Sequence, residues 1–266
     1  TFILLLARQL VWMKGRGDMK SIPAVGLLAG NLLVTIGLYY VISSDMGSAL
    51  VYVCIFACMA FAAGVALRWF ALGIFGAGAG FYLLWELDKI PPYMKERFQV
   101  LVDHSLYPLE AGWQQTRSLM AIGGGRLTGQ GLLHGAQTQS TSSVNLPFRH
   151  TDFIFAVICE QLGQVFGVLL LAVYVLLILR GVTVVARARR SFEMLLGCGV
   201  LTMLGIQTFM IVAGVIKMIP LTGVTMPFLS YGGSSLLSCM AMIGILHGAS
   251  ARAQENLEED ILCVRG

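Results

Sequence analysis

The stretch Arg149-His150-Thr151-Asp152-Phe153-Ile154-Phe155 decides how this chain folds, because a carboxylate stands there where a polar segment enters a long apolar one. The apolar run extends to Leu179 and is long enough to cross a bilayer core of about 30 Å as a helix. A carboxylate is costly to desolvate at a membrane mouth, so a chain that carries one there usually uses it. Asp152 is therefore predicted either to serve chemistry at the membrane surface or to complement the dipole of a helix N-terminus.

The composition indicates a membrane protein. Hydrophobic residues make up 57% of the 266 residues and charged residues 12%, whereas a soluble domain has about 25% charged residues. The net charge of +4 is too small to indicate a nucleic-acid partner. No pair among the six cysteines has the CxxC spacing of a metal or redox site, so we interpret them as small apolar residues of helices.

Six apolar stretches are long enough to be transmembrane helices, each of which needs about 20 residues. They are residues 22–43, 47–67, 69–87, 152–179, 194–216 and 231–249. Residues 88–151 form a polar loop that is far longer than the usual connections of about 4–6 residues. The predicted fold class is all-α, a polytopic membrane helical bundle with one long loop. The predicted division of the chain is 1–87, 88–151 and 152–266.

The basic residues predict the orientation, because cytoplasmic loops carry an excess of Lys and Arg. One cluster around Lys14 precedes the first stretch, and a second from Arg180 to Arg190 follows the fourth. Counting the predicted spans places both clusters on the cytoplasmic side. The 88–151 loop and Asp152 are then extracytoplasmic, and the tail beyond residue 252 is cytoplasmic.

Two further segments contain glycines whose role the residues leave open. The segment 219–235 contains two prolines and then Gly232-Gly233-Ser234-Ser235. Irregular backbone at membrane depth is tolerated only where it is buried in protein or lines a wet cavity. The amides and hydroxyls of this run would either hold an anion or allow close helix packing. The glycines of residues 123–135 are predicted to form turns, because neither a Walker A lysine nor a preceding strand accompanies them.

Four separated motifs resemble those of the SEDS family (shape, elongation, division and sporulation), the RodA/FtsW/SpoVE-type bacterial cell-wall proteins. They are, in order, Asp45-Met46-Gly47-Ser48-Ala49-Leu50; Ala121-Ile122-Gly123-Gly124-Gly125 with Gly129-Gln130-Gly131; His150-Thr151-Asp152-Phe153-Ile154-Phe155; and Pro220-Leu221-Thr222-Gly223 with Ser230-Tyr231-Gly232-Gly233-Ser234-Ser235. The resemblance covers essentially the whole chain and corresponds to the later six of the family's ten spans. Because the chain also begins with Thr1, we expect it to lack part of its N-terminus. It departs from the family's pattern at Ser44, Phe148 and Gln161.

The resemblance implies an activity. Members of the family are peptidoglycan glycosyltransferases that polymerise lipid II into glycan strands on the outer face of the cytoplasmic membrane, usually beside a class B penicillin-binding protein. Their essential acid lies in the motif that His150-Thr151-Asp152-Phe153 matches, so Asp152 is implied to be the catalytic base. Two alternatives stay open, a flippase or transporter of lipid-linked precursors and a non-catalytic scaffold for a penicillin-binding protein. A role in elongation, division or sporulation is equally open.

A pyrophosphate leaving group would need cations or amide donors. The candidate substrate-binding residues are Arg149, His150, Lys217, Tyr231, Gly232, Gly233, Ser234 and Ser235, with Arg117 and Arg126 as further cations. His150 would orient Asp152 or contact the substrate, or else cap the helix entrance. A divalent cation is a candidate cofactor, although one Asp with scattered His makes no metal-ligand pattern. Glu160 is expected to interact with a polar group inside the bundle.

Overall fold

A computed structural model describes residues 1–16, 21–43, 46–88, 92–102, 111–138, 146–188 and 190–265. Every regular element in these residues is an α-helix, which confirms the predicted fold class. The chain divides into two compact units. One comprises Thr1–Phe75, Leu176–Ile206 and Leu236–Gly266, and the other comprises Gly76–Val175 and Gln207–Ser235. The predicted division at residues 87 and 151 concerns the sides of the membrane, and it stays a prediction.

Four helices of the described chain are long and apolar enough to cross a membrane. They are α2 (Ile22–Ser43), α4 (Leu67–Glu86), α8 (Gln164–Ala186) and α9 (Ser191–Val215). Two shorter apolar helices, α3 (Met46–Ala63) and the first part of α10 (Gly233–Arg265), coincide with the other two predicted stretches. In α4 no described residue is buried, so its apolar side chains require a hydrocarbon environment and not water.

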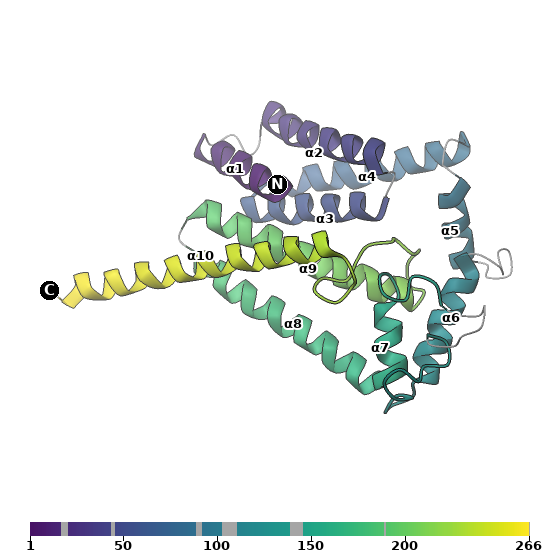
Figure 1. The fold of residues 1–266 in the computed structure, drawn as a ribbon. Helices are drawn as coiled ribbons and strands as arrows, with labels where there is room; N and C mark the ends of the chain where they lie inside the picture. The colour runs from purple at the N-terminus through teal and green to yellow at the C-terminus, as the bar shows by residue number, and fades with distance from the viewer. Residues whose placement is uncertain are drawn as a thin grey trace. The chain divides into compact units, whose positions relative to one another are not determined.

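The first unit contains a helix that the sequence analysis did not predict, α1 (Phe2–Gly15), which lies beside α2 and α3 (Figure 1). Leu6, Leu10 and Met13 are buried along one face of it. Their i, i+4, i+7 spacing is the pattern of an amphipathic helix, and it was available in the sequence. The helix does not have the pattern of a membrane span of about 20 apolar residues, because it has only 14 residues and contains Arg8 and Lys14.

The second unit shows that the prediction of one continuous span over residues 152–179 is wrong. The helix is interrupted at Gly163, which separates α7 (Ile154–Leu162) from α8. Gly163 has a φ of 94°, a conformation that residues with a Cβ rarely adopt. With nine residues α7 is too short to cross a bilayer, and Phe155, Ala156 and Cys159 are buried in the core of the unit. Only α8 has the length of a span.

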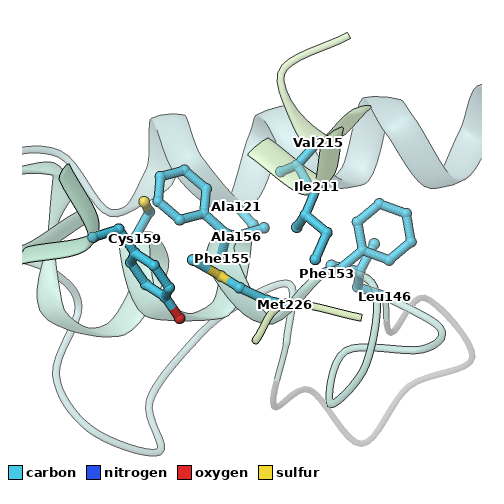
Figure 2. Packing of buried hydrophobic residues seen from close by; sticks show 10 residues of the cluster. Ala121, Leu146, Phe153, Phe155, Ala156, Cys159, Ile211, Val215 and Met226 are labelled. Atoms are coloured by element: carbon cyan, nitrogen blue, oxygen red, sulfur yellow. The ribbon is translucent and has the colours of Figure 1, made fainter. Parts of the chain in front are cut away.

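The predicted long loop contains two helices in its described part, α5 (Pro92–Val102) and α6 (Ala111–Gly124). The second of these, α6, lies beside α7 (Figure 1). It contributes Ala121 to a buried cluster that also contains Phe153 and Ala156 of the α7 region and Val215 of α9 (Figure 2). The segment therefore packs against helices of its own unit. The removal of its apolar surface from water stabilises it there.

The turn prediction for the glycines of residues 123–135 is wrong for Gly123 and Gly124, which are the last two residues of α6. The glycines that follow α6 lie in irregular chain, as predicted, and also allow two backbones to approach closely. A Cβ on Gly125 would overlap the carbonyl oxygen of Cys159, and one on Gly129 would overlap that of Gln161. The close approach lets Gln130 N–H donate to the carbonyl of Glu160 at 2.9 Å. The motif around these glycines thus joins the end of α6 to the end of α7.

The glycine motif offers a matched test of this packing, since Gly125 is crowded whereas a Cβ on Gly123 would meet no heavy atom within 4 Å. We expect Gly125→Ala to destabilise the protein by about 1–3 kcal/mol, because the backbones of α6 and α7 must move apart. Gly123→Ala should be neutral or stabilising by about 0.5–1 kcal/mol, because Ala favours a helix. Thermal unfolding of the purified protein in detergent measures both, and equal melting temperatures for the two variants would contradict the packing.

Candidate active site

Asp152 lies in the turn that leads into α7 and is half-buried. The turn is closed by the carbonyl of Phe148, which accepts from the N–H groups of Thr151 at 3.0 Å and Phe153 at 3.3 Å. The side chains of Leu146 and Phe153 are each 1% exposed and lie together in the core cluster (Figure 2). Burial of two large apolar side chains, worth about 1.5–3 kcal/mol each, therefore anchors the turn on both sides of Asp152.

The position of Asp152 relative to α7 bears on the alternative that it only complements a helix dipole. Phe153 is the N-cap residue of α7, and the first turn of the helix contains no acidic residue. Asp152 therefore precedes the cap and is not part of the helix. Likewise His150 lies further back in the turn, where its Nε2 accepts a hydrogen bond from Nε of Arg149 at 3.2 Å. Capping of α7 by His150 finds no support in this geometry.

The turn that carries Asp152 is held by the segment that follows α9. Ser230 Oγ donates to the carbonyl of Thr151 at 2.6 Å and accepts from the N–H of Met226 at 2.8 Å. Beside it, the N–H of Tyr231 donates to the carbonyl of His150 at 2.8 Å. Two motifs that are about eighty residues apart in the sequence thus join through the main chain directly before Asp152.

The same segment is fixed from its other side. The hydroxyl of Tyr174, in α8, donates to the carbonyl of Pro227. Met226 is fully buried in the core cluster next to Phe155 (Figure 2). Phe228 has a φ of 65°, so the chain reverses at that point at some conformational cost. The hydrogen bonds and the burial of Met226 compensate for this strain.

The run from Tyr231 to Ser235 contains the first three residues of α10 and is exposed or half-buried throughout. Tyr231 is 81% exposed, and a Cβ on Gly233 would meet no heavy atom within 4 Å. Close helix packing, one of the two predicted roles, therefore does not explain Gly233. Ser234 is exposed, and Ser235 Oγ lies 3.0 Å from Oγ1 of Thr225. The first amides of α10 stand at the positive end of its dipole, where an anion would be favoured.

The predicted cations lie at different places around the turn. Arg149 donates from its guanidinium to the carbonyl of Thr138, and Arg117 donates to Oε1 of Gln137 at 2.7 Å. Lys217 follows the end of α9 with a φ of 64° and is half-buried. Arg126 is exposed at the end of α6. The structure thus brings Arg149 and Arg117 to two neighbouring residues, Gln137 and Thr138.

Three residues that matter to this geometry had no role assigned from the sequence, although Ser230 belongs to the fourth motif. Ser230, Gln137 and Thr138 are ordinary polar residues, and only their contacts reveal that they hold the turn. Glu160 was expected to meet a polar group inside the bundle, and its partners are the main-chain amides of Gln137 and Thr138.

Two predicted features stay predictions. Within the described ranges no three His, Cys, Asp or Glu residues lie close enough to hold a metal ion. This finding concerns protein ligands alone, and the divalent cation stays a prediction. In the first motif, Ser44 and Asp45 lie outside the described residues.

Known proteins resemble this chain over most of its length. It is 37% identical over 202 residues to the peptidoglycan glycosyltransferase MrdB of Escherichia coli strain K12. The matched residues make up 76% of this chain and 54% of MrdB. It is 33% identical over 254 residues to the probable peptidoglycan glycosyltransferase FtsW of Geobacter sulfurreducens. The matched residues make up 95% of this chain and 66% of that protein. The chain thus spans about half to two thirds of the length of these curated relatives.

Two solved structures share the fold. A chain from a peptidoglycan synthase complex that coordinates polymerization and crosslinking superimposes with a TM-score of 0.75 at 28% identity, over 95% of this chain and 68% of its own length. A crystal structure of a mutant of the rod shape determining protein RodA of Thermus thermophilus has a TM-score of 0.57 at 24% identity, over 92% of this chain and 63% of its own length. The second match concerns the fold alone.

The family is shown by the sequence as a whole. Residues 1–255 match the cell cycle protein family that comprises FtsW, RodA and SpoVE. These are the proteins that the four motifs resemble. Together with the four apolar helices, the match identifies a multi-pass protein of the bacterial cytoplasmic membrane. The chain belongs to the FtsW/RodA/SpoVE cell cycle protein family.

Proposed function

We propose that the protein is a peptidoglycan glycosyltransferase that polymerises lipid II into glycan strands at the outer face of the cytoplasmic membrane. One observation carries the proposal, namely that Ser230 and Tyr231, in the fourth of the family's motifs, are hydrogen-bonded to the turn with Asp152, in the third. The relatives named MrdB and FtsW, both called peptidoglycan glycosyltransferases, support it. Because the chain covers 54% of MrdB, the activity is proposed for the protein as the cell makes it.

Asp152 is the proposed general base. The acceptor's 4-hydroxyl is a poor nucleophile, and a carboxylate that takes its proton should contribute about 10²–10⁴-fold to the rate. The hydroxyl oxygen then bonds to the anomeric carbon of the donor, the bond from that carbon to the pyrophosphate oxygen breaks, and the lipid pyrophosphate leaves. A half-buried carboxylate on an anchored turn suits this role, because the main chain that carries it is held in place before the substrate arrives.

Negative charge accumulates on the leaving pyrophosphate and must be stabilised. Arg149, Lys217 and the first amides of α10, those of Gly233, Ser234 and Ser235, are the proposed donors. Tyr231 and Gly232 directly precede these amides, and His150 lies beside Arg149. A divalent cation would add to this stabilisation.

The proposed partner is a class B penicillin-binding protein, which would cross-link the strands. The similarity to a chain of a complex that coordinates polymerization and crosslinking supports this partner. The relatives carry two different names, MrdB and FtsW, so the proposed cellular role is cell elongation, division or sporulation. A lipid flippase and a non-catalytic scaffold are the competing functions.

We expect Asp152→Asn to abolish glycan-strand synthesis from lipid II, because the amide cannot accept the proton that the carboxylate takes. The protein should still fold and reach the membrane, since Leu146 and Phe153 anchor the turn without it. Synthesis is measured by gel separation of labelled strands made by the purified protein in lipid vesicles, and melting temperature is the control.

Wild-type rates in Asp152→Asn would rule out the base. Movement of lipid II across vesicles without polymer, in the unmodified protein, would instead favour the flippase. A cell-wall phenotype that survives Asp152→Ala would favour the scaffold.

Ser230 should matter through the turn it supports. Ser230→Ala leaves the carbonyl of Thr151 and the N–H of Met226 without their partner, which we expect to cost about 1–3 kcal/mol of local stability. A loosened turn should lower kcat/KM by about 10–100-fold, because the base is no longer held in place. The same vesicle assay measures this, and Ser230→Thr, which keeps the hydroxyl, should restore most of the activity.

Ser238→Ala is the matched control, because Ser238 is exposed further along α10. A loss of activity in this variant equal to that in Ser230→Ala would show that the effect is not specific to the turn.

A further inference from the structure

We propose that Glu160 is a positioning residue of this active site, which fixes Arg149 beside Asp152 through the main chain of Gln137 and Thr138. The inference rests on the proposed function and deepens it. It concerns a buried carboxylate on α7 that the proposed chemistry does not use.

Glu160 is fully buried near the C-terminal end of α7. Its Oε1 accepts from the N–H of Gln137 at 2.7 Å, and its Oε2 accepts from the N–H of Thr138 at 3.1 Å. A buried charge is costly unless hydrogen bonds compensate for its lost hydration, and bonds to a carboxylate are about twice as strong as neutral ones. The two amides are therefore held more firmly than amides in an ordinary loop.

The surroundings of Glu160 leave room for this arrangement. A Cβ on Gly135 would lie 2.5 Å from Oε2 of Glu160 and would collide with Thr138. Gly135 is buried, so a side chain there has no direction in which to escape. A glycine at residue 135 is thus a condition for the two hydrogen bonds.

The carbonyls of the same two residues point to the turn that carries Asp152. The carbonyl of Gln137 accepts from the N–H of Leu146 at 3.0 Å, and the carbonyl of Thr138 accepts from the guanidinium of Arg149. Gln137 and Thr138 are thus bonded to Glu160 on one side and to the Asp152 turn on the other. A shift of their main chain would move Arg149 directly.

The carboxylate is required and not only a polar side chain of that size. A glutamine could accept from one of the two amides, but its NH₂ group would face the other N–H and repel it. The conservative exchange Glu160→Asp keeps the charge but shortens the reach by one methylene. Because the Thr138 amide is bonded to Glu160 and the Thr138 carbonyl to Arg149, Glu160 is expected to act on the reaction through the direction of the Arg149 guanidinium.

A double-mutant cycle tests this route, with polymerisation of lipid II by the protein as the cell makes it, in lipid vesicles. Glu160→Gln should lower kcat/KM by about 10²-fold in the wild-type background, as expected for a misplaced reacting group. With Arg149→Ala already present, the same change should have an effect of less than about 3-fold, because residues that act through one another are not additive. Equal effects in both backgrounds would overturn the proposal.

Two further variants separate positioning from a general loss of stability. Gly135→Ala displaces the carboxylate without removing its charge, and it should show the same non-additivity with Arg149→Ala. Glu193→Gln is the matched control, since Glu193 is a buried carboxylate at the start of α9 in the other unit. Its effect should be the same with and without Arg149. Non-additivity of Glu193→Gln as well would attribute the cycle to unfolding and would overturn the proposal.

Amide hydrogen exchange decides the question without reference to activity. Peptides that cover Gln137 and Thr138 should exchange slowly in the unmodified protein and at least about tenfold faster in Glu160→Gln, because local opening sets the exchange rate. The peptide from 146 to 151 should follow them. Unchanged exchange would overturn the proposal even if activity falls. If the unmodified protein makes no polymer but the Gln137 and Thr138 amides still exchange faster in Glu160→Gln, the proposed function is wrong and the positioning role of Glu160 stands.

Discussion

The hydroxyl of Ser230 is the contact on which the rest of the site depends. Water is not available to hydrogen-bond the peptide groups of an irregular segment at or near membrane depth, so each group must find a partner in the protein. Ser230 provides one partner to Thr151 and one to Met226, and so joins two such segments at once. The anchored residues around it, Phe153 and Met226, are apolar and buried, which keeps water away from these hydrogen bonds and strengthens them.

A second junction follows from the absence of side chains. At Gly125, Gly129 and Gly163 a Cβ would overlap a carbonyl oxygen of the neighbouring segment, so two backbones can approach only because these residues are glycines. The junction fixes where α7 ends and where the segment after α6 begins. That segment then reaches Glu160, whose carboxylate lies at the end of the same short helix. Backbone approach and a buried charge therefore act on the same few residues.

Two charged side chains of the site are connected through the main chain of the same two residues. The carboxylate of Glu160 and the guanidinium of Arg149 lie on opposite sides of two residues, Gln137 and Thr138, and Arg117 adds a bond to the side chain of the first. Each cation is thus held by neutral oxygens and not by a carboxylate in these contacts, which leaves its positive charge available to an anion. For a reaction that releases a pyrophosphate, this is the arrangement that electrostatic stabilisation requires.

The apolar stretches, their length and the motifs around Asp152 were sufficient to predict an all-helical membrane protein, its family and the residues to examine, because hydrophobic length and local motifs are properties of contiguous sequence. The break at Gly163 was missed, since a glycine in an apolar run does not reveal its φ. The roles of Ser230, which was quoted only as part of a motif, and of Thr138 were missed because they come from contacts with residues far away in the chain. Which carbonyl a hydroxyl reaches, and which amides a buried carboxylate holds, depends on how α6, α7 and the end of α9 pack, and only the tertiary structure decides that.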